Sequence, residues 1–220
     1  NQFNYEWVSS SNTLILNYLA DSSAVQQLSA TVWIKPSELS WFDMDLNLSN
    51  NWGYDLDYVL FPSDLVFDQA LINEALLPVL PGIVLESTFF DQDRTYLADY
   101  PGYPGIFSDF VSISNSTGDI AIYSVNSTQT ISPVLIGFIH DDEYIANSTY
   151  YYHSFGTGLA DGESWTSPSI RIQISQDHIN SIAAFKTANG FHLIPDLQTK
   201  FGAIYQQVHN LLFIKSVLKR

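Results

Sequence analysis

The chain has 220 residues, 46% of them hydrophobic and 15% aromatic, and its 8 Lys and Arg face 23 Asp and Glu for a formal charge of −15. This length suits one domain with a real core, and the apolar content excludes a disordered chain. The acidic excess excludes a free-standing nucleic-acid binder and electrostatic docking on an anionic membrane, and the absence of cysteine excludes disulfides and thiol chemistry.

Alternation of apolar and polar residues predicts many half-buried strands. In the segment 41–49, Phe42, Met44, Leu46 and Leu48 fall on one face, while the acids and amides between them fall on the other. Other segments rich in Val, Ile, Tyr, Phe and Thr predict strands at 13–19, 29–34, 54–61, 83–90, 107–114, 119–125, 134–140, 149–155, 169–175 and 191–194.

Two segments have helical rather than alternating spacing. Residues 63–77 begin at Ser63, a favourable N-cap, and stop before Pro78. Residues 196–218 also predict a helix, although their end equally suits a strand. Asn115 to Gly118, Asp161-Gly162 and Asn189-Gly190 predict hairpin turns.

This pattern predicts a single all-β domain over residues 1–220, built as a two-sheet β-sandwich or jelly roll with one or two short helices. Charge is uneven along it: residues 1–110 carry a net −13, whereas residues 186–220 carry a net +4. The basic tail at 196–220 is therefore expected to contact an acidic sheet, either its own or that of a second subunit.

Four Asn-x-Ser/Thr acceptors occur, at Asn47, Asn115, Asn126 and Asn147. Three of them repeat Asn-Ser-Thr at turn-like places, which predicts N-glycosylated loops on a secreted protein. The alternative is that these residues simply supply the turns. No apolar run reaches transmembrane length and the sequence starts at Asn1, so we expect a processed, soluble chain.

Carboxylates supply the candidate catalytic groups. Glycoside hydrolysis needs two of them, one kept protonated by burial. Glu86 lies in the apolar segment 83–90, and Asp109, Asp142 and Glu143 are candidate partners. An outward-facing Glu86 is the alternative.

Metal and ligand contacts have their own candidates. Asp91 and Asp93 flank one residue in a loop-like segment, which is a spacing that suits Ca²⁺. His140 and His153 end or follow apolar strands and would form a His/carboxylate metal site if those strands pair. The alternatives are a solvated acidic surface and an acidic loop. Tyr151, in a run of three tyrosines, and Trp165, beside a turn, are candidate aromatic contacts for sugar rings, unless they fill the core.

The sequence of residues 136–172 resembles one blade of the β-propeller glycosidases and sialidase-like proteins. It reads Ile-Gly-Phe-Ile-His-Asp-Asp-Glu from Ile136 and ends in Asp161-Gly-Glu-Ser-Trp165. The resemblance implies a partial or small propeller as the alternative fold, with His140, Asp142 and Glu143 lining a sugar pocket.

These observations predict a secreted, N-glycosylated all-β protein that binds or processes carbohydrate, with Ca²⁺ as the one cofactor suggested. The alternative is a structural subunit of an extracellular filament, coat or adhesive layer, which assembles as a homo-oligomer through its basic apolar tail.

Overall fold

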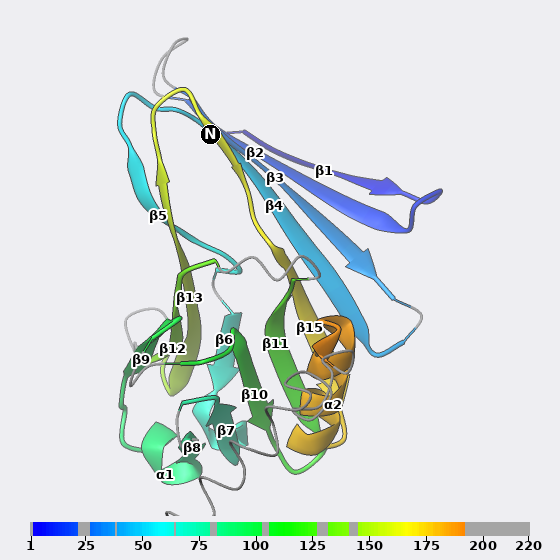
Figure 1. The fold of residues 1–220 in the computed structure, drawn as a ribbon, viewed down its shortest axis with the longest axis vertical. Helices are drawn as coiled ribbons and strands as arrows, with labels where there is room; N and C mark the ends of the chain where they lie inside the picture. Colours follow the sequence, from blue (N-terminus) through cyan, green and yellow to red (C-terminus); the bar gives the residue numbers. More distant parts are fainter. Residues whose placement is uncertain are drawn as a thin grey trace, which may run out of the picture.

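The computed structural model describes residues 2–21, 27–37, 39–63, 65–79, 83–102, 106–126, 132–140 and 145–191. Their strands form two antiparallel sheets with two short α-helices, α1 (Ser87–Phe90) and α2 (His178–Ala188), and a 3₁₀ turn, η1 (Gln69–Leu71) (Figure 1). The strands are β1 (Gln2–Val8), β2 (Thr13–Asp21), β3 (Gln27–Pro36), β4 (Trp41–Asn51), β5 (Leu56–Leu60), β6 (Leu65–Asp68), β7 (Glu74–Leu77), β8 (Ile83–Glu86), β9 (Tyr96–Tyr100), β10 (Phe110–Ser114), β11 (Asp119–Val125), β12 (Val134–His140), β13 (Ser148–Leu159), β14 (Ser164–Thr166) and β15 (Ser169–Ser175).

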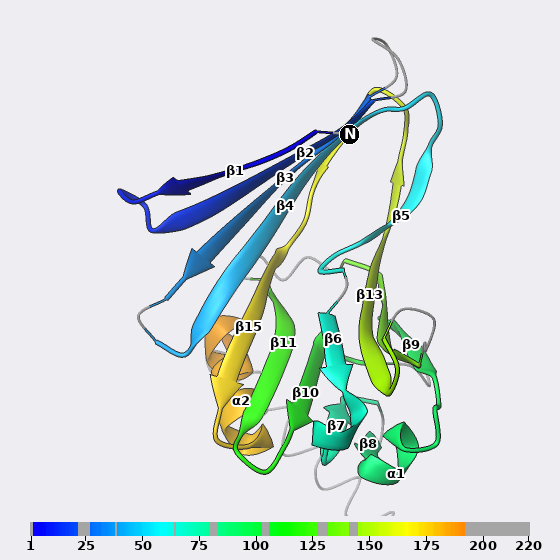
Figure 2. The ribbon, with the colours of Figure 1, turned by 180° about the vertical axis from the view of Figure 1, so that it is seen from behind.

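The larger sheet has ten strands in the order β1-β2-β3-β4-β15-β11-β10-β7-β8, with β14 paired to β4. The smaller sheet has the order β5-β13-β12-β9, with β6 paired to β13. The predicted all-β sandwich with short helices is therefore confirmed. Figures 1 and 2 show that β1–β3 fan out beyond β4, on the side away from the smaller sheet.

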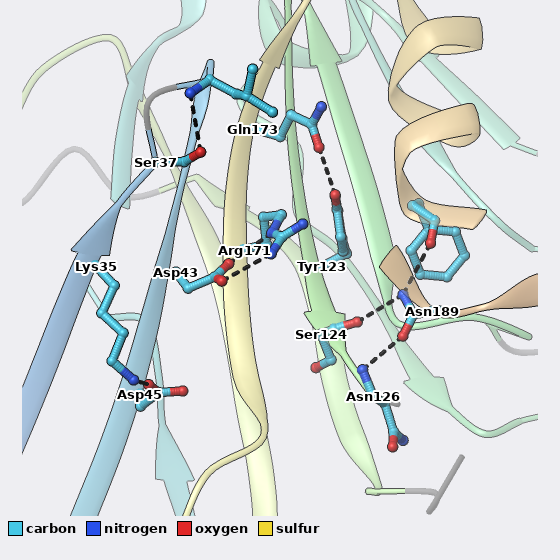
Figure 3. Close-up of polar contacts among 12 residues, drawn as sticks. Lys35, Ser37, Asp43, Asp45, Tyr123, Ser124, Asn126, Arg171, Gln173 and Asn189 are labelled. Atoms are coloured by element: carbon cyan, nitrogen blue, oxygen red, sulfur yellow. Dashed lines mark hydrogen bonds and ion pairs between the residues drawn. The ribbon is translucent and has the colours of Figure 1, made fainter. Parts of the chain in front are cut away.

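The alternation predicted for β4 is confirmed. Leu46 and Leu48 are buried, and Asp43 and Asp45 lie on the opposite, wetter face. Two acids side by side on a strand repel each other unless a counter-charge is present. Arg171 of β15 makes a bidentate pair with Asp43 at 2.7 and 2.9 Å, and Lys35 of β3 pairs with Asp45 (Figure 3).

The core lies between the smaller sheet and the part of the larger sheet that runs β4-β15-β11-β10-β7-β8. Phe138 of β12 is fully buried and packs edge-on against Phe90 of α1, with ring centroids 5.4 Å apart. From the larger sheet, Val111 and Ile122 are also fully buried in this cluster. Alternate residues of β10, β11 and β12 thus supply the apolar interior that the sequence pattern predicted.

The helix predicted over 63–77 is wrong. The segment forms two short strands, β6 and β7, which join different sheets across the turn η1. Asp68 caps this turn by accepting a hydrogen bond from the Ala70 amide at 3.0 Å. The apolar spacing suited a helix only because two alternating strands and a turn follow each other within fifteen residues.

The three predicted turns have different outcomes. Asn115 to Gly118 closes the β10–β11 hairpin, with Asn115 N donating to Gly118 O at 2.9 Å. Asp161-Gly162 makes a turn, but β13 and β14 belong to different sheets and form no hairpin. Asn189-Gly190 ends α2 instead of joining two strands.

The propeller blade expected at residues 136–172 is not formed. β12 and β13 belong to the smaller sheet, whereas β14 and β15 belong to the larger one. A blade would place these strands in one sheet. The segment therefore crosses from one layer of the sandwich to the other.

The helix α2 was not predicted from the sequence. Asp177 caps it by accepting from the Asn180 amide at 2.8 Å. Among the described helices, none is long and apolar enough to cross a bilayer. The tail at 196–220, with its predicted helix or strand and its basic contact, lies outside the described residues, as does most of the strand predicted at 191–194.

Candidate functional site

A cavity of about 460 Å³ opens where α2 covers the ends of β10 and β11, and we call it the α2 cavity. Aromatic rings and polar groups share its wall. The lining residues are Tyr100, Phe107, Ser108, Asp109, Ser124, Asn126, Ser132, Pro168, Ile182, Phe185, Lys186, Asn189 and Phe191. Apolar and aromatic side chains combined with convergent polar groups are the usual composition of a small-molecule site.

A buried polar network forms the floor of the α2 cavity. The carboxylate of Asp109, only 7% exposed, accepts a hydrogen bond from Ser124 Oγ and lies 2.9 Å from His153 Nε2. His153 Nδ1 lies 2.7 Å from the carbonyl oxygen of Phe61. A carbonyl can only accept, so Nδ1 is the donor to Phe61, and the other ring nitrogen, Nε2, faces the carboxylate of Asp109. The network therefore fixes Asp109 in place.

The carboxylate of Asp109 affects the pKa values of two tyrosines. Burial, and then the negative charge of Asp109, raise the pKa of Tyr100, which lines the cavity. The same two causes raise the pKa of the buried Tyr151 well above its usual value. Both phenols therefore stay protonated near neutral pH, and the Tyr100 side chain presents a ring with a neutral hydroxyl.

Asn189 ties the end of α2 to the cavity wall. Its side-chain amide donates to Ser124 O and Phe185 O, both at 3.2 Å, and its Oδ1 accepts from the Asn126 backbone amide at 2.7 Å (Figure 3). One buried side chain thus joins the helix end to β11. Phe185 and Asn189 are held in position relative to Asp109 by these bonds.

A second buried network anchors the start of α2. Asp119 of β11 accepts hydrogen bonds from Ser112 and Ser181, and its Oδ1 lies 2.7 Å from His178 Nδ1. Burial alone would raise the pKa of Asp119, but the hydrogen bonds from His178, Ser112 and Ser181 outweigh burial and lower it. The hydrogen bond to Asp119 raises the pKa of His178, although burial opposes it. Glu74 Oε1, 3.1 Å from His178 Nε2, adds to the same shift.

Three residues predicted as ligand contacts lie in one aromatic row. Tyr151, His153 and Phe155 are alternate residues of β13, and Trp165 of β14 continues the row, with centroid separations of 5.9, 4.7 and 5.2 Å. Tyr151 and His153 are 2% and 1% exposed. His153 contacts Asp109, Tyr151 is buried in the core, and Trp165 is half-buried against that core.

His140 and His153 do not face each other, although β12 and β13 pair as predicted. The register sets His140 opposite Thr149 and His153 opposite Ile136. Instead His140 Nδ1 lies 2.9 Å from Gln69 Nε2 and 3.5 Å from Asp93 Oδ1. A His-His metal site across this hairpin is therefore wrong.

Asp91 and Asp93 line a separate surface hollow of about 770 Å³. Asp68, Gln69 and Asn147 line the same hollow. Over the described parts of the chain, no three His, Asp or Glu side chains are grouped closely enough to hold a metal ion. The calcium site stays a prediction.

Of the three predicted catalytic acids, only Glu86 can be placed. It is exposed at the end of β8, opposite Glu74 of β7, so the burial expected to keep it protonated is absent. Asp142 and Glu143 lie outside the described residues. Among the described residues that line the α2 cavity, Asp109 is the only acid.

The four glycosylation acceptors occupy different surroundings. Asn115 and Asn147 are exposed in turns, and Asn147 has a left-handed φ of 59°. Asn47 is half-buried within β4 and donates to Thr166 Oγ1 at 2.9 Å. Asn126 lies in the wall of the α2 cavity.

Comparison with known proteins gives no family. No protein-family model matches the chain, and no curated protein matches it. Among solved structures, the chain is similar to heparan sulfate lyase HepC from Pedobacter heparinus, with a TM-score of 0.37 and 9% sequence identity. The alignment covers 80% of this chain and 22% of that chain, so it spans about a fifth of the lyase's length.

Most residues of the α2 cavity were missed by sequence reasoning. Asp109 was considered only as a partner of Glu86, and Phe107, Phe185, Lys186 and Asn189 were not considered as site residues. The signal for the last three was the undetected helix: Asp177 as an N-cap, eleven residues without Gly or Pro, and Asn189-Gly190 as its stop.

Proposed function

We propose that this chain is a secreted, N-glycosylated β-sandwich that binds carbohydrate in the α2 cavity. The observation that carries the proposal is the wall of the cavity. Phe107, Tyr100 and Phe185 supply rings beside the hydrogen-bonding groups of Asp109 and Asn126. Apolar sugar faces stack on such rings, while hydroxyl groups pair with carboxylates and amides.

Charge favours an uncharged ligand. The formal charge of −15 repels polyanions, and the described lining offers one carboxylate and one ammonium group, those of Asp109 and Lys186. A neutral oligosaccharide meets both groups through its hydroxyls without a net electrostatic cost.

Binding is favoured over hydrolysis. Glycosidases flank the scissile bond with two carboxyl groups. The described lining of the α2 cavity contains one acid, Asp109, and so offers no second carboxyl group. The arrangement therefore suits a lectin-like module.

Phe107 provides the sharpest test because its side chain is 55% exposed and contributes little to the core. Full-length protein is screened on an array of neutral and acidic glycans, and affinity for the best ligand is measured by calorimetry. We expect Phe107→Ala to weaken binding roughly tenfold, which corresponds to about 1.4 kcal/mol.

The matched control is Tyr54→Ala, which removes a ring that is 70% exposed but does not line the cavity. It should leave the affinity unchanged. Absence of binding to any glycan on a broad array, or equal loss in both variants, would refute the proposal.

The structural-subunit alternative retains one supporting observation. Its proposed docking tail lies outside the described residues, but the larger sheet exposes Phe3, Tyr5, Trp7 and Tyr18 by 56, 72, 51 and 43%. Apolar exposure on this scale is a feature of interaction surfaces.

A further inference from the structure

The first two strands expose one apolar face, which we call the aromatic face. It consists of Phe3, Tyr5 and Trp7 of β1 and Leu14, Leu16 and Tyr18 of β2. On β3 the same side is apolar and already borders the core, since Val32 is only 9% exposed. Figures 1 and 2 show these strands extending past the rest of the sandwich. Phe3 contacts both Tyr5 and Tyr18, at centroid distances of 6.3 and 4.8 Å.

The aromatic face continues the buried side of the larger sheet. The register sets Phe3 opposite Tyr18, Tyr18 opposite Ala30, and Ala30 opposite Leu48. Directly opposed residues share one side of a sheet, and Leu48 is only 6% exposed. The side that is buried at β4 is thus exposed at β1.

The reverse side of the same strands is mixed: Ile15, Leu19 and Trp33 lie there among polar residues, several of which are hydrogen-bonded to each other. Thr31 Oγ1 donates to Asn17 Oδ1, and Asn17 Nδ2 donates to Asn4 Oδ1, each at 3.0 Å. This row suits contact with water. The aromatic face, which is apolar throughout, therefore gains more by being covered than the mixed reverse side does.

The composition of the aromatic face favours an apolar protein surface over a sugar as its partner. Every residue of β1–β3 on this side is apolar or aromatic, with Leu, Val and Ile beside the rings. A sugar would need amide or carboxylate groups next to the rings, as in the α2 cavity, and this side of the described strands has none. The apolar face of another sheet matches it, because two such faces interdigitate about 10 Å apart.

We propose that two copies of this chain associate with their aromatic faces packed against each other, which completes a second sandwich between them. A twofold axis makes the contact self-complementary, since each copy offers the same half-sandwich. A fully buried ring removes 150–250 Å² from water, so covering four half-exposed rings buries roughly 400 Å² per copy. That is about half of the ~800 Å² that each partner of a standard interface buries, before Leu14, Leu16 and the strand backbones are included.

Sedimentation velocity of the full-length chain across protein concentrations tests the contact. We expect a dimer that Tyr5→Lys dissociates, with a dissociation constant raised at least tenfold, because each substitution acts twice across the axis. Tyr5 is 72% exposed, so the monomer should retain its fold, as checked by circular dichroism. Glu6→Lys, which places the same charge on the reverse side of β1, should leave the dimer intact.

Two results would overturn the proposal. Either the chain remains monomeric at several hundred micromolar, or Tyr5→Lys leaves a dimer intact. A dimer that Phe213→Ser dissociates while Tyr5→Lys does not would assign assembly to the C-terminal tail. Saturable glycan binding that Tyr5→Lys abolishes in a monomer would assign the face to carbohydrate. The outcomes that concern assembly do not bear on the α2 cavity, which Phe107→Ala tests separately, whereas glycan binding lost in Tyr5→Lys would also count against carbohydrate binding in that cavity.

Discussion

At the scale of single residues, charged groups of this acidic chain are held by specific partners. Asp43 and Asp45 required a nearby base on electrostatic grounds alone, and the structure supplies Arg171 and Lys35 from the two neighbouring strands. Arg171 also stacks over Trp41 at 3.6 Å. The need for a partner could be predicted from the sequence, whereas its identity depended on the pairing of β4 with β15 across more than 120 residues.

The environment of Tyr123 likewise depends on the tertiary structure. Burial raises its pKa to about 12, against the opposing effect of Arg171, and its hydroxyl donates to Gln173 at 2.6 Å. Its position between β15 and α2 gives it this environment (Figure 3). A tyrosine in an alternating strand carries no local signal of such burial.

The His178–Asp119 pair should make stability depend on pH. The raised pKa of His178 gives a stabilisation that is complete below its usual value of 6.5 and is lost as pH rises through the folded value. The lowered pKa of Asp119 gives a second stabilisation. It is present above the usual pKa of 3.8 and is lost as pH falls through the pKa of the folded state. We therefore expect the pair to contribute most between about pH 4 and 6.5.

Urea denaturation from pH 4 to 9 measures this contribution. His178→Gln should lower the free energy of unfolding by roughly 3 kcal/mol at pH 5.5, because Asp119 loses its buried partner, and should flatten the decline above pH 6.5. Lys186→Gln, on the same helix but exposed, serves as the control. Parallel pH profiles for the wild type and His178→Gln would contradict the expectation.

At the scale of elements, prediction succeeded where burial is one-sided. β4, β12 and β15 alternate because one face of each contacts the core, and their positions could be predicted from period-two patterns. β6 and β7 have four residues each, too few for a period to be distinguished from helical spacing. The helix α2 is weakly amphipathic, with Ile179 exposed by 77%, so its apolar periodicity was uninformative.

The pairing of β9 with β12 depends on a glycine. Gly137 has a φ of 155°, and a Cβ there would lie 2.0 Å from the backbone oxygen of Tyr96. Because backbone atoms of a paired strand cannot yield cheaply, we expect Gly137→Ala to destabilise the fold by about 3 kcal/mol or more. Thermal denaturation would detect the change.

Gly156 of β13 provides the control, since a Cβ there meets nothing within 4 Å. Gly156→Ala should change the free energy of unfolding by less than about 0.5 kcal/mol. Equal melting temperatures for the two variants would show that β9 shifts to accommodate the methyl group.

At the scale of the whole molecule, the sandwich divides the glycosylation acceptors. We expect chain secreted from a glycosylating host to carry glycans at Asn115 and Asn147, which lie in exposed turns, and none at Asn47, whose amide is bonded within the sheet. Peptide mass spectrometry before and after enzymatic deglycosylation measures occupancy. Asn115→Gln should remove one glycan mass, and unmodified Asn115 and Asn147 would argue against the secreted assignment.

The sequence alone determined that this is an all-β sandwich with an acidic surface, because alternation and charge are local properties of the chain. Only the tertiary structure decided which residues meet. Ser124 of β11 and His153 of β13 belong to different sheets, Asp109 directly precedes β10, and α2 closes the cavity above them. The aromatic face likewise alternates as core strands do. Its exposure follows from sheet order, since β1 lies at the end of the larger sheet, beyond the reach of the smaller one.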